Sequence, residues 1–193
     1  NGAAFRTRHA ISPRRPTMLV VGRVAHEKNL PFLLDVLARV RRTLADVLLV
    51  IAGEGPALAS LRRSVAARGL QDNVMFVGYL DRAGALRECY SAADVFVFAS
   101  RTETQGLVLL ESLACGTPVA AYPVTGPIDV LAGGNAGAMN EDLREACLDA
   151  LKIDRADARA WAERFSWQAA SAQFASHLKP LARGAEREES AAA

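Results

Sequence analysis

The sequence has no apolar run long enough to cross a membrane, since a spanning helix needs about 20 such residues. Nor does an apolar stretch follow the basic residues near the start, as a secretory signal peptide would require. The three cysteines, Cys89, Cys115 and Cys147, are odd in number and lack paired spacing. Buried free thiols in a reducing compartment explain them most simply, so we expect a cytoplasmic protein.

An excess of charge of one sign is also lacking. The 23 basic and 21 acidic side chains give a formal net charge of +2, which predicts no strong field for nucleic acid. The charge is uneven, however, because five arginines precede Glu27, the first acidic residue. We interpret residues 1–16 as an irregular interdomain linker. Contact of this basic stretch with an anionic membrane surface, at its inner face, is the alternative.

Several catalytic signatures are missing as well. His, Cys and Asp are not grouped at metal-ligand spacing, so we predict no metal site, and no nucleophile–base pair stands out. Gly53-x-Gly55 begins like a dinucleotide-binding motif, but Leu58 occupies the position of the third glycine. The pair also follows the second predicted strand rather than the first, which disfavours a nicotinamide-dependent oxidoreductase. We interpret it as a turn before a helix that begins at Pro56.

The 193 residues are enough for one compact domain with a substantial core. Apolar runs without polar alternation predict buried strands at 17–22, 47–52, 74–77, 95–99 and 118–122. Helical patterns lie between them at about 30–42, 56–68, 82–92 and 106–115. Asn29 and Asp81 are candidate N-caps. This strict alternation predicts an α/β fold, a Rossmann-like parallel sheet with helices on both faces.

Beyond Pro123 the pattern is weaker. We expect a short helix at 127–131, a glycine-rich stretch at 132–139, and helices at 141–152, 155–165 and 167–178. Residues 183–193 are predicted to be disordered. The main domain is therefore expected to span 17–182. Because the chain starts at Asn1 without an initiator methionine, we expect a fragment or an excised domain.

The stretch Ser100–Thr117 carries the most specific chemistry. Its helix, at about 106–115, is apolar nearly all round and is expected to be buried. Glu111 lies on this helix, and because a buried unpaired carboxylate is unfavourable, we expect it to have a hydrogen-bonding partner. Glu103 precedes the helix, whose N-terminus directs unsatisfied N–H groups at an anion. An acid on each side of an anion site suits a sugar nucleotide.

Ligands of open α/β sheets bind beyond the carboxyl ends of the strands. Five candidate residues follow predicted strands and are expected at that edge: Arg23, Lys28, Gly78, Glu103 and Gly106. A guanidinium and an ammonium in one loop suit a diphosphate. The alternative is that both are ordinary exposed surface charges.

Glu103-x7-Glu111, with Gly106 between them, resembles the E-x7-E signature of the retaining glycosyltransferases of family four, which have the GT-B architecture. Gly22-Arg23 followed by Lys28 resembles that family's phosphate-binding loop. The resemblance implies the C-terminal, donor-binding half of such an enzyme, with a nucleotide-sugar-binding domain at 17–182. The acceptor half is expected to precede this one, so the chain is expected to bind donor and to transfer nothing by itself.

The resemblance implies transfer of a sugar from a nucleotide diphosphate sugar to a glycan or lipid-linked acceptor, with retention of configuration, in cell-envelope polysaccharide synthesis. No cofactor or metal is implied. Catalytic roles go to Arg23, Lys28 and Glu103, and Glu111 is expected to bind the ribose. The implied donor-binding set is Gly22, Gly78, Tyr79, Leu80, Thr104, Gln105, Gly106, Leu107, Val108 and Glu111.

Alternatives remain for the two acids and for the whole domain. Glu103 can be an acid that interacts favourably with the helix dipole, and Glu111 a core-edge carboxylate paired with an arginine. Thr104 and Gln105 depart from the family pattern, which leaves the donor sugar open. A non-catalytic domain that binds a nucleotide sugar or a partner is the alternative function, because a fold can host unrelated activities.

Overall fold

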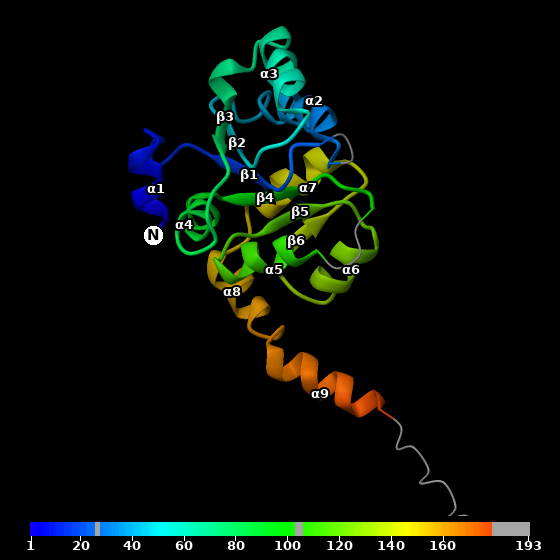
Figure 1. The fold of residues 1–193 in the computed structure, drawn as a ribbon. Helices are drawn as coiled ribbons and strands as arrows, with labels where there is room; N and C mark the ends of the chain where they lie inside the picture. Colours follow the sequence, from blue (N-terminus) through cyan, green and yellow to red (C-terminus); the bar gives the residue numbers. More distant parts are fainter. Residues whose placement is uncertain (26–27, 103–105, 179–193) are drawn as a thin grey trace, which may run out of the picture. The chain divides into compact units, whose positions relative to one another are not determined.

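The computed structural model describes residues 1–25, 28–102 and 106–178 (Figure 1). The described residues divide into two compact units, Asn1–Glu163 and a second that contains helix α9 (Trp167–His177). Within the described ranges, no helix is both long enough and apolar enough to cross a membrane.

The first unit is built on a parallel sheet of six strands in the order β3-β2-β1-β4-β5-β6. This confirms the predicted Rossmann-like α/β fold, and the strand order reverses between β1 and β4, where Met18 pairs with Val95. The strands are β1 (Thr17–Val21), β2 (Leu48–Ala52), β3 (Val74–Gly78), β4 (Val95–Phe98), β5 (Val119–Ala121) and β6 (Gly137–Met139).

The helices follow the strands as predicted, but their ends differ. Asn29 occupies the N-cap position of α2 in a left-handed conformation and makes no side-chain capping bond. The Asp81 carboxylate accepts from the amide of Gly84, so it organises the turn before α4 rather than capping the helix itself. The bounds are α2 (Leu30–Val40), α3 (Leu58–Ala67), α4 (Ala85–Ala92), α5 (Leu107–Ala114), α6 (Thr125–Leu131), α7 (Leu143–Ala150) and α8 (Arg155–Ala162).

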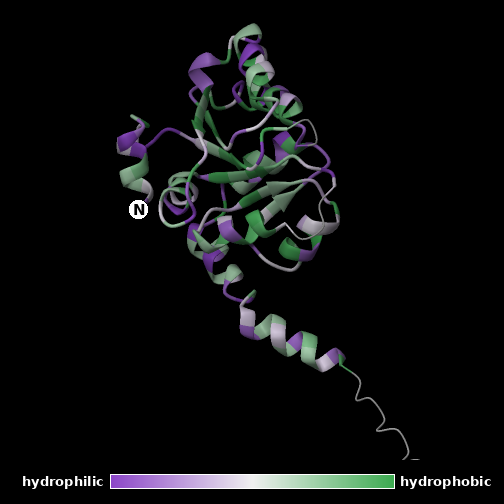
Figure 2. Cartoon of the chain, viewed as in Figure 1, coloured by the Kyte–Doolittle hydropathy of each residue, from purple (hydrophilic) through white to green (hydrophobic). Residues whose placement is uncertain are grey.

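Two apolar cores lie on opposite faces of the sheet. Neighbouring strand residues alternate between them, so that Met18 belongs to one core and Leu19 to the other. Helices α2, α3 and α7 supply the first core, while α4, α5, α6 and α8 supply the second. Figure 2 shows largely apolar strands and helices in which apolar and polar residues are mixed. The predicted coverage of both faces is therefore confirmed.

The N-terminal segment departs from the prediction. Gly2–Arg8 form a helix, α1, which packs against α4, so the expectation of irregular structure throughout residues 1–16 is wrong. Phe5 and Ile11 are buried in the second core, and the Asn1 side chain caps the helix by accepting from the amide of Ala3 at 3.1 Å. Residues 1–16 thus belong to the compact unit. Whether the segment also joins another domain stays a prediction.

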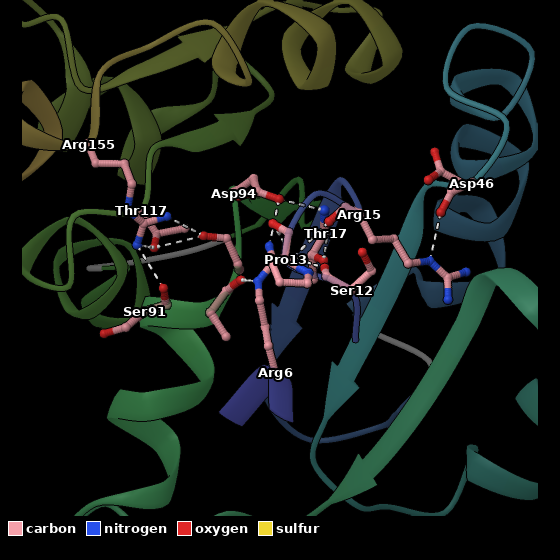
Figure 3. A network of polar contacts seen from close by, with 12 residues as sticks. Arg6, Ser12, Pro13, Arg15, Thr17, Asp46, Ser91, Asp94, Thr117 and Arg155 are labelled. Atoms are coloured by element: carbon pink, nitrogen blue, oxygen red, sulfur yellow. Dashed lines mark hydrogen bonds and ion pairs between the residues drawn. The ribbon is translucent and has the colours of Figure 1, made fainter. Parts of the chain in front are cut away.

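A buried arginine, Arg6, fastens this segment to the sheet (Figure 3). Arg6, only 9% exposed, donates to the carbonyl of Ala92 at 2.8 Å and to the carboxylate of Asp94 at 2.8 Å. The same Asp94 oxygen accepts from the amide of Thr17, the first residue of β1, at 2.8 Å. Arg155 of α8 donates to the carbonyl of Ala93 at 2.5 Å. These bonds satisfy carbonyls at the end of α4, and Arg6 of the basic stretch thus serves contacts within the chain.

Candidate functional site

A cavity of about 410 Å³ opens at the carboxyl ends of β1 and β4, where the strand order reverses. This is the position at which open α/β sheets bind ligands. The predicted residues that line it come from the loop after β1 and from the start of α5: Gly22, Arg23, Lys28, Gly106, Leu107 and Val108. The structure therefore brings together two segments that are far apart in the sequence.

The loop after β1 is fixed by the turn after β2. The amide of Gly22 donates to the carbonyl of Ala52 at 3.0 Å, and the amide of Val24 donates to the carbonyl of Glu54 at 2.9 Å. A β-carbon at Gly53 or Gly55 would overlap the backbone of the facing loop. Arg23 lies between the two bonded residues. The glycine pair is thus a turn, as predicted, although α3 begins at Leu58 rather than Pro56.

The start of α5 presents backbone amides to the cavity. Gly106 precedes the helix with φ 65° and ψ 39°, a left-handed conformation that glycine adopts without a steric penalty. The amide of Leu109 donates to the carbonyl of Gly106 at 2.8 Å. The amides of Leu107 and Val108 precede it in the first turn, where no intrahelical carbonyl can accept from them. They combine with the positive end of the helix dipole to favour an anion.

The burial predicted for this helix is confirmed in only part of it. Leu109 and Leu113 are fully buried, whereas the side chain of Leu107 is 55% exposed. The first turn borders the cavity instead of the core, which is why an apolar sequence alone gave the wrong burial. Glu103, Thr104 and Gln105 lie outside the described residues, so their assigned roles stay predictions.

A second cavity, of about 310 Å³, adjoins the first through Gly22 and Arg23. Gly78 ends β3 with φ 71°, and its carbonyl accepts from the amide of Gly53 at 2.8 Å. The chain then turns so that Tyr79 and Leu80 line this cavity, with the Tyr79 side chain 72% exposed. The residues predicted at the end of β3 and just beyond it therefore lie next to Gly22 and Arg23 of the loop after β1.

Glu111 lies one turn into α5 and has two side-chain partners. Its Oε1 accepts from Arg82 Nη1 at 2.7 Å, and its Oε2 accepts from the Tyr90 hydroxyl at 2.9 Å. The expectation of a hydrogen-bonding partner is confirmed. Burial, together with the Glu111 carboxylate, raises the pKa of Tyr90, so this hydroxyl stays protonated and acts as the donor.

The surroundings of Glu111 differ from the prediction in one respect. Glu111 lines a third cavity, of about 180 Å³, and not the one that holds Arg23 and Lys28. Arg82 lines both the second and the third cavity and so joins them. Sequence reasoning missed Arg82 and Tyr90 as site residues. The sequence did offer a signal for Tyr90, which lies among apolar residues of a predicted helix. A buried tyrosine hydroxyl needs a hydrogen-bonding partner.

The three cysteines are free thiols. Burial raises the pKa of Cys89 and of Cys147 to about 12, and it also raises the pKa of Cys115. Such thiols stay protonated and unreactive near neutral pH. In the part of the chain that the structure describes, no group of three or more His, Cys, Asp or Glu side chains is placed to hold a metal ion.

Comparison with known proteins matches the sequence of this chain to one family. Residues 3–163 match the family model of glycosyl transferases group 1. The chain is 37% identical over 150 residues to the alpha-monoglucosyldiacylglycerol synthase of Streptococcus pneumoniae, a match that covers 76% of this chain and 34% of that protein. It is 34% identical over 182 residues to a GDP-mannose-dependent alpha-(1-6)-phosphatidylinositol dimannoside mannosyltransferase of Mycobacterium tuberculosis, with coverage of 90% and 46%. The chain thus spans less than half the length of these curated relatives.

Solved structures show the same fold. Alr3699/HepE of Anabaena, in complex with UDP, superposes with a TM-score of 0.76 at 20% identity, covering 91% of this chain and 51% of that one. WaaG, a glycosyltransferase involved in lipopolysaccharide biosynthesis, gives a TM-score of 0.70 at 25% identity, with coverage of 89% and 47%. The chain belongs to the glycosyl transferases group 1 family and has the Rossmann-like fold of one half of a GT-B glycosyltransferase.

Proposed function

We propose that this chain is the donor-binding half of a retaining glycosyltransferase that moves a sugar from a nucleotide diphosphate sugar to a glycan or lipid-linked acceptor. The observation that carries the proposal is the shared cavity at the end of β1 and β4. It places Arg23 and Lys28 with the first amides of α5. Two cationic side chains and the positive end of a helix suit a diphosphate.

The remaining parts of the donor fit the neighbouring cavities. Glu111 is four residues beyond Leu107 on α5, a rise of about 6 Å along the helix. A ribose bound by Glu111 would therefore be adjacent to a diphosphate at the helix start. The cavity lined by Tyr79 and Leu80 would take the base, with the exposed Tyr79 ring available for stacking.

The chemistry proposed for this site is stabilisation of a leaving group. When the bond between the anomeric carbon of the sugar and the diphosphate oxygen breaks, negative charge builds on the diphosphate. Preorganised donors aimed at that charge lower the barrier. We assign this role to Arg23, Lys28 and the α5 amides rather than to a metal or another cofactor, and we assign Glu103 to the sugar hydroxyls.

The acceptor side is proposed to lie in a further domain. The relatives are more than twice as long as the stretch this chain matches, which supports a missing acceptor domain and an isolated chain that binds donor without transferring it. The names of these relatives include diacylglycerol and phosphatidylinositol, which supports lipid-linked acceptors. The alpha linkage named for the second relative is in keeping with retention. We propose a cytoplasmic role in cell-envelope synthesis.

Calorimetry with UDP-glucose, GDP-mannose and ADP-glucose tests the proposal. At least one should bind the wild-type chain, and Lys28→Ala should weaken that binding about tenfold, because a charge-assisted contact to phosphate is lost. Lys152→Ala is the matched control, since Lys152 is outside the cavity and pairs with Asp149 at 2.7 Å. No binding of any of the three would reject a donor-binding role, and equal losses in both variants would reject the role given to Lys28.

A further inference from the structure

The two partners of Glu111 differ in how firmly they are held. Tyr90 is 2% exposed, and its ring packs against Phe96 of β4 with centroids 5.7 Å apart. Its backbone carbonyl accepts from the hydroxyl of Thr117 at 2.7 Å, and that hydroxyl in turn accepts from Arg155 at 3.2 Å. Tyr90 is thus fixed in place by the core and by the bonded Thr117 and Arg155 at the end of α4.

Arg82 is held far less firmly. It lies in the loop between β3 and α4, and its side chain is 74% exposed, against 27% for Glu111. An ion pair with so exposed a partner contributes little to stability, because water screens the charges. Arg82 also lines the cavity beside Tyr79 as well as the one beside Glu111, so its side chain borders two regions that a nucleotide would fill.

We propose that Tyr90 is a positioning residue that holds Glu111 for ribose binding, and that Arg82 is the exchangeable partner that the ribose hydroxyls replace. This inference rests on the proposed donor-binding function and adds a residue to it. A carboxylate can accept about four hydrogen bonds, so Oε2 can keep its bond from Tyr90 while the carboxylate receives the ribose. Tyr90 lines the same small cavity as Glu111, and the role assigned to it here is to act through Glu111.

The test compares UDP, GDP and ADP with their 2′,3′-dideoxy forms, which lack the hydroxyls that Glu111 would bind. Calorimetry is run on the wild-type chain, on Tyr90→Phe, which keeps the packed ring, and on Arg82→Gln, which removes the other partner. The wild type should bind the ribose form about tenfold more tightly than the dideoxy form. Tyr90→Phe should abolish most of this preference, whereas Arg82→Gln should keep it with equal or tighter binding of the ribose form.

The outcomes separate the inference from the proposed function. If Tyr90→Phe keeps the wild-type preference for the ribose form, the inference is overturned while the proposed function stands. The same holds if Tyr90→Phe loses affinity equally for both forms, because that indicates a general structural effect. If Arg82→Gln loses as much of the preference for the ribose form as Tyr90→Phe does, the two partners of Glu111 do not differ in role and the inference is overturned. If the wild type binds none of UDP, GDP and ADP, the proposed function fails and the inference with it.

A measurement on the wild-type chain covers the case in which Tyr90→Phe does not fold. NMR of protein labelled at tyrosine Cζ and at the arginine guanidinium is recorded with and without UDP. The Arg82 signal should shift on binding while the Tyr90 signal stays in place. A shift of Tyr90 with no change at Arg82 would overturn the inference.

Discussion

The amide of Val24 donates to the carbonyl of Glu54 at 2.9 Å, and this bond joins the loop that carries Arg23 and Lys28 to the turn after β2. The contact is close because Gly55, next to Glu54, has no side chain. A β-carbon there would overlap the backbone of Val24. The position of the cationic loop therefore depends on a glycine that touches no donor in our assignment.

Gly55→Ala is predicted to destabilise the protein and to weaken nucleotide binding. Its φ of 158° is strained for alanine, which alone costs about 1–3 kcal/mol, and the overlap with Val24 adds to this. Gly69→Ala is the control, since Gly69 also has a positive φ but has open space around its α-carbon. Denaturation and UDP titration should show a stability loss in both variants and an affinity loss in Gly55→Ala only. An equal affinity for UDP in the two variants would contradict the role given to the turn.

Arg6→Ala is predicted to lower the free energy of unfolding by about 3 kcal/mol. The substitution removes several charge-assisted bonds and leaves the carboxylate of Asp94 and the carbonyl of Ala92 without this donor. Arg14→Ala, at an exposed arginine of the same segment, should change stability by less than about 0.5 kcal/mol. Urea denaturation measures both. Equal, small effects would show that the contacts of Arg6 drawn in Figure 3 contribute little.

Acid is predicted to weaken the link between α2 and α7. Arg39 lowers the pKa of Asp142, aided by the amide of Arg144, so the folded carboxylate binds protons less readily than the unfolded one. The stabilisation of the folded state by the Asp142 carboxylate is complete at pH values above its usual pKa of 3.8. It is lost as the pH falls through the lower pKa of the folded state. Asp142→Ala should cost about 1 kcal/mol near neutral pH, mainly because α7 loses its N-cap.

The matched variant for Asp142 is Asp142→Asn, which can still cap α7 but cannot pair with Arg39. Both side chains of the pair are more than a third exposed, so the difference from wild type should be at most about 1 kcal/mol near neutral pH. This difference should disappear as the pH falls through the folded pKa of Asp142. A difference that grows on acidification would contradict the sign of the pKa shift. Denaturation curves across the acid range provide the measurement.

Removal of divalent ions is predicted to leave nucleotide binding intact. If Arg23, Lys28 and the α5 amides neutralise the diphosphate, UDP or GDP should bind with the same affinity before and after treatment with EDTA. Added salt should weaken the binding more in wild type than in Lys28→Ala, because salt screens the lysine charge. Binding lost with EDTA and restored by Mg²⁺ would contradict the assignment, as would equal salt dependence.

Much of the fold follows from apolar periodicity, because buried strands and the helices between them leave a clear pattern. Helix α1 was missed since it is short, rich in arginine and fixed by the distant contacts of Phe5 and Arg6. Strand β6 was missed because three small or flexible residues carry no pattern. Its Gly137 lies so close to β5 that a β-carbon would meet the carbonyl of Val119.

The candidate site likewise contains residues that the sequence could place and residues that it could not. Arg23 and Lys28 could be placed near Gly106 from the sequence, because all three follow strands of one parallel sheet. The partners of Glu111 could not, since Arg82 is 29 positions away and Tyr90 is 21. Only the packing of α4 against α5 brings them together.

The position of a nucleoside diphosphate bound to the wild-type chain tests the central claim most directly. In crystals soaked with UDP or GDP, we predict electron density for the diphosphate at the amides of Leu107 and Val108, between the side chains of Arg23 and Lys28, with the ribose at Glu111. A diphosphate bound elsewhere on the chain, with this cavity empty, would contradict the proposed function.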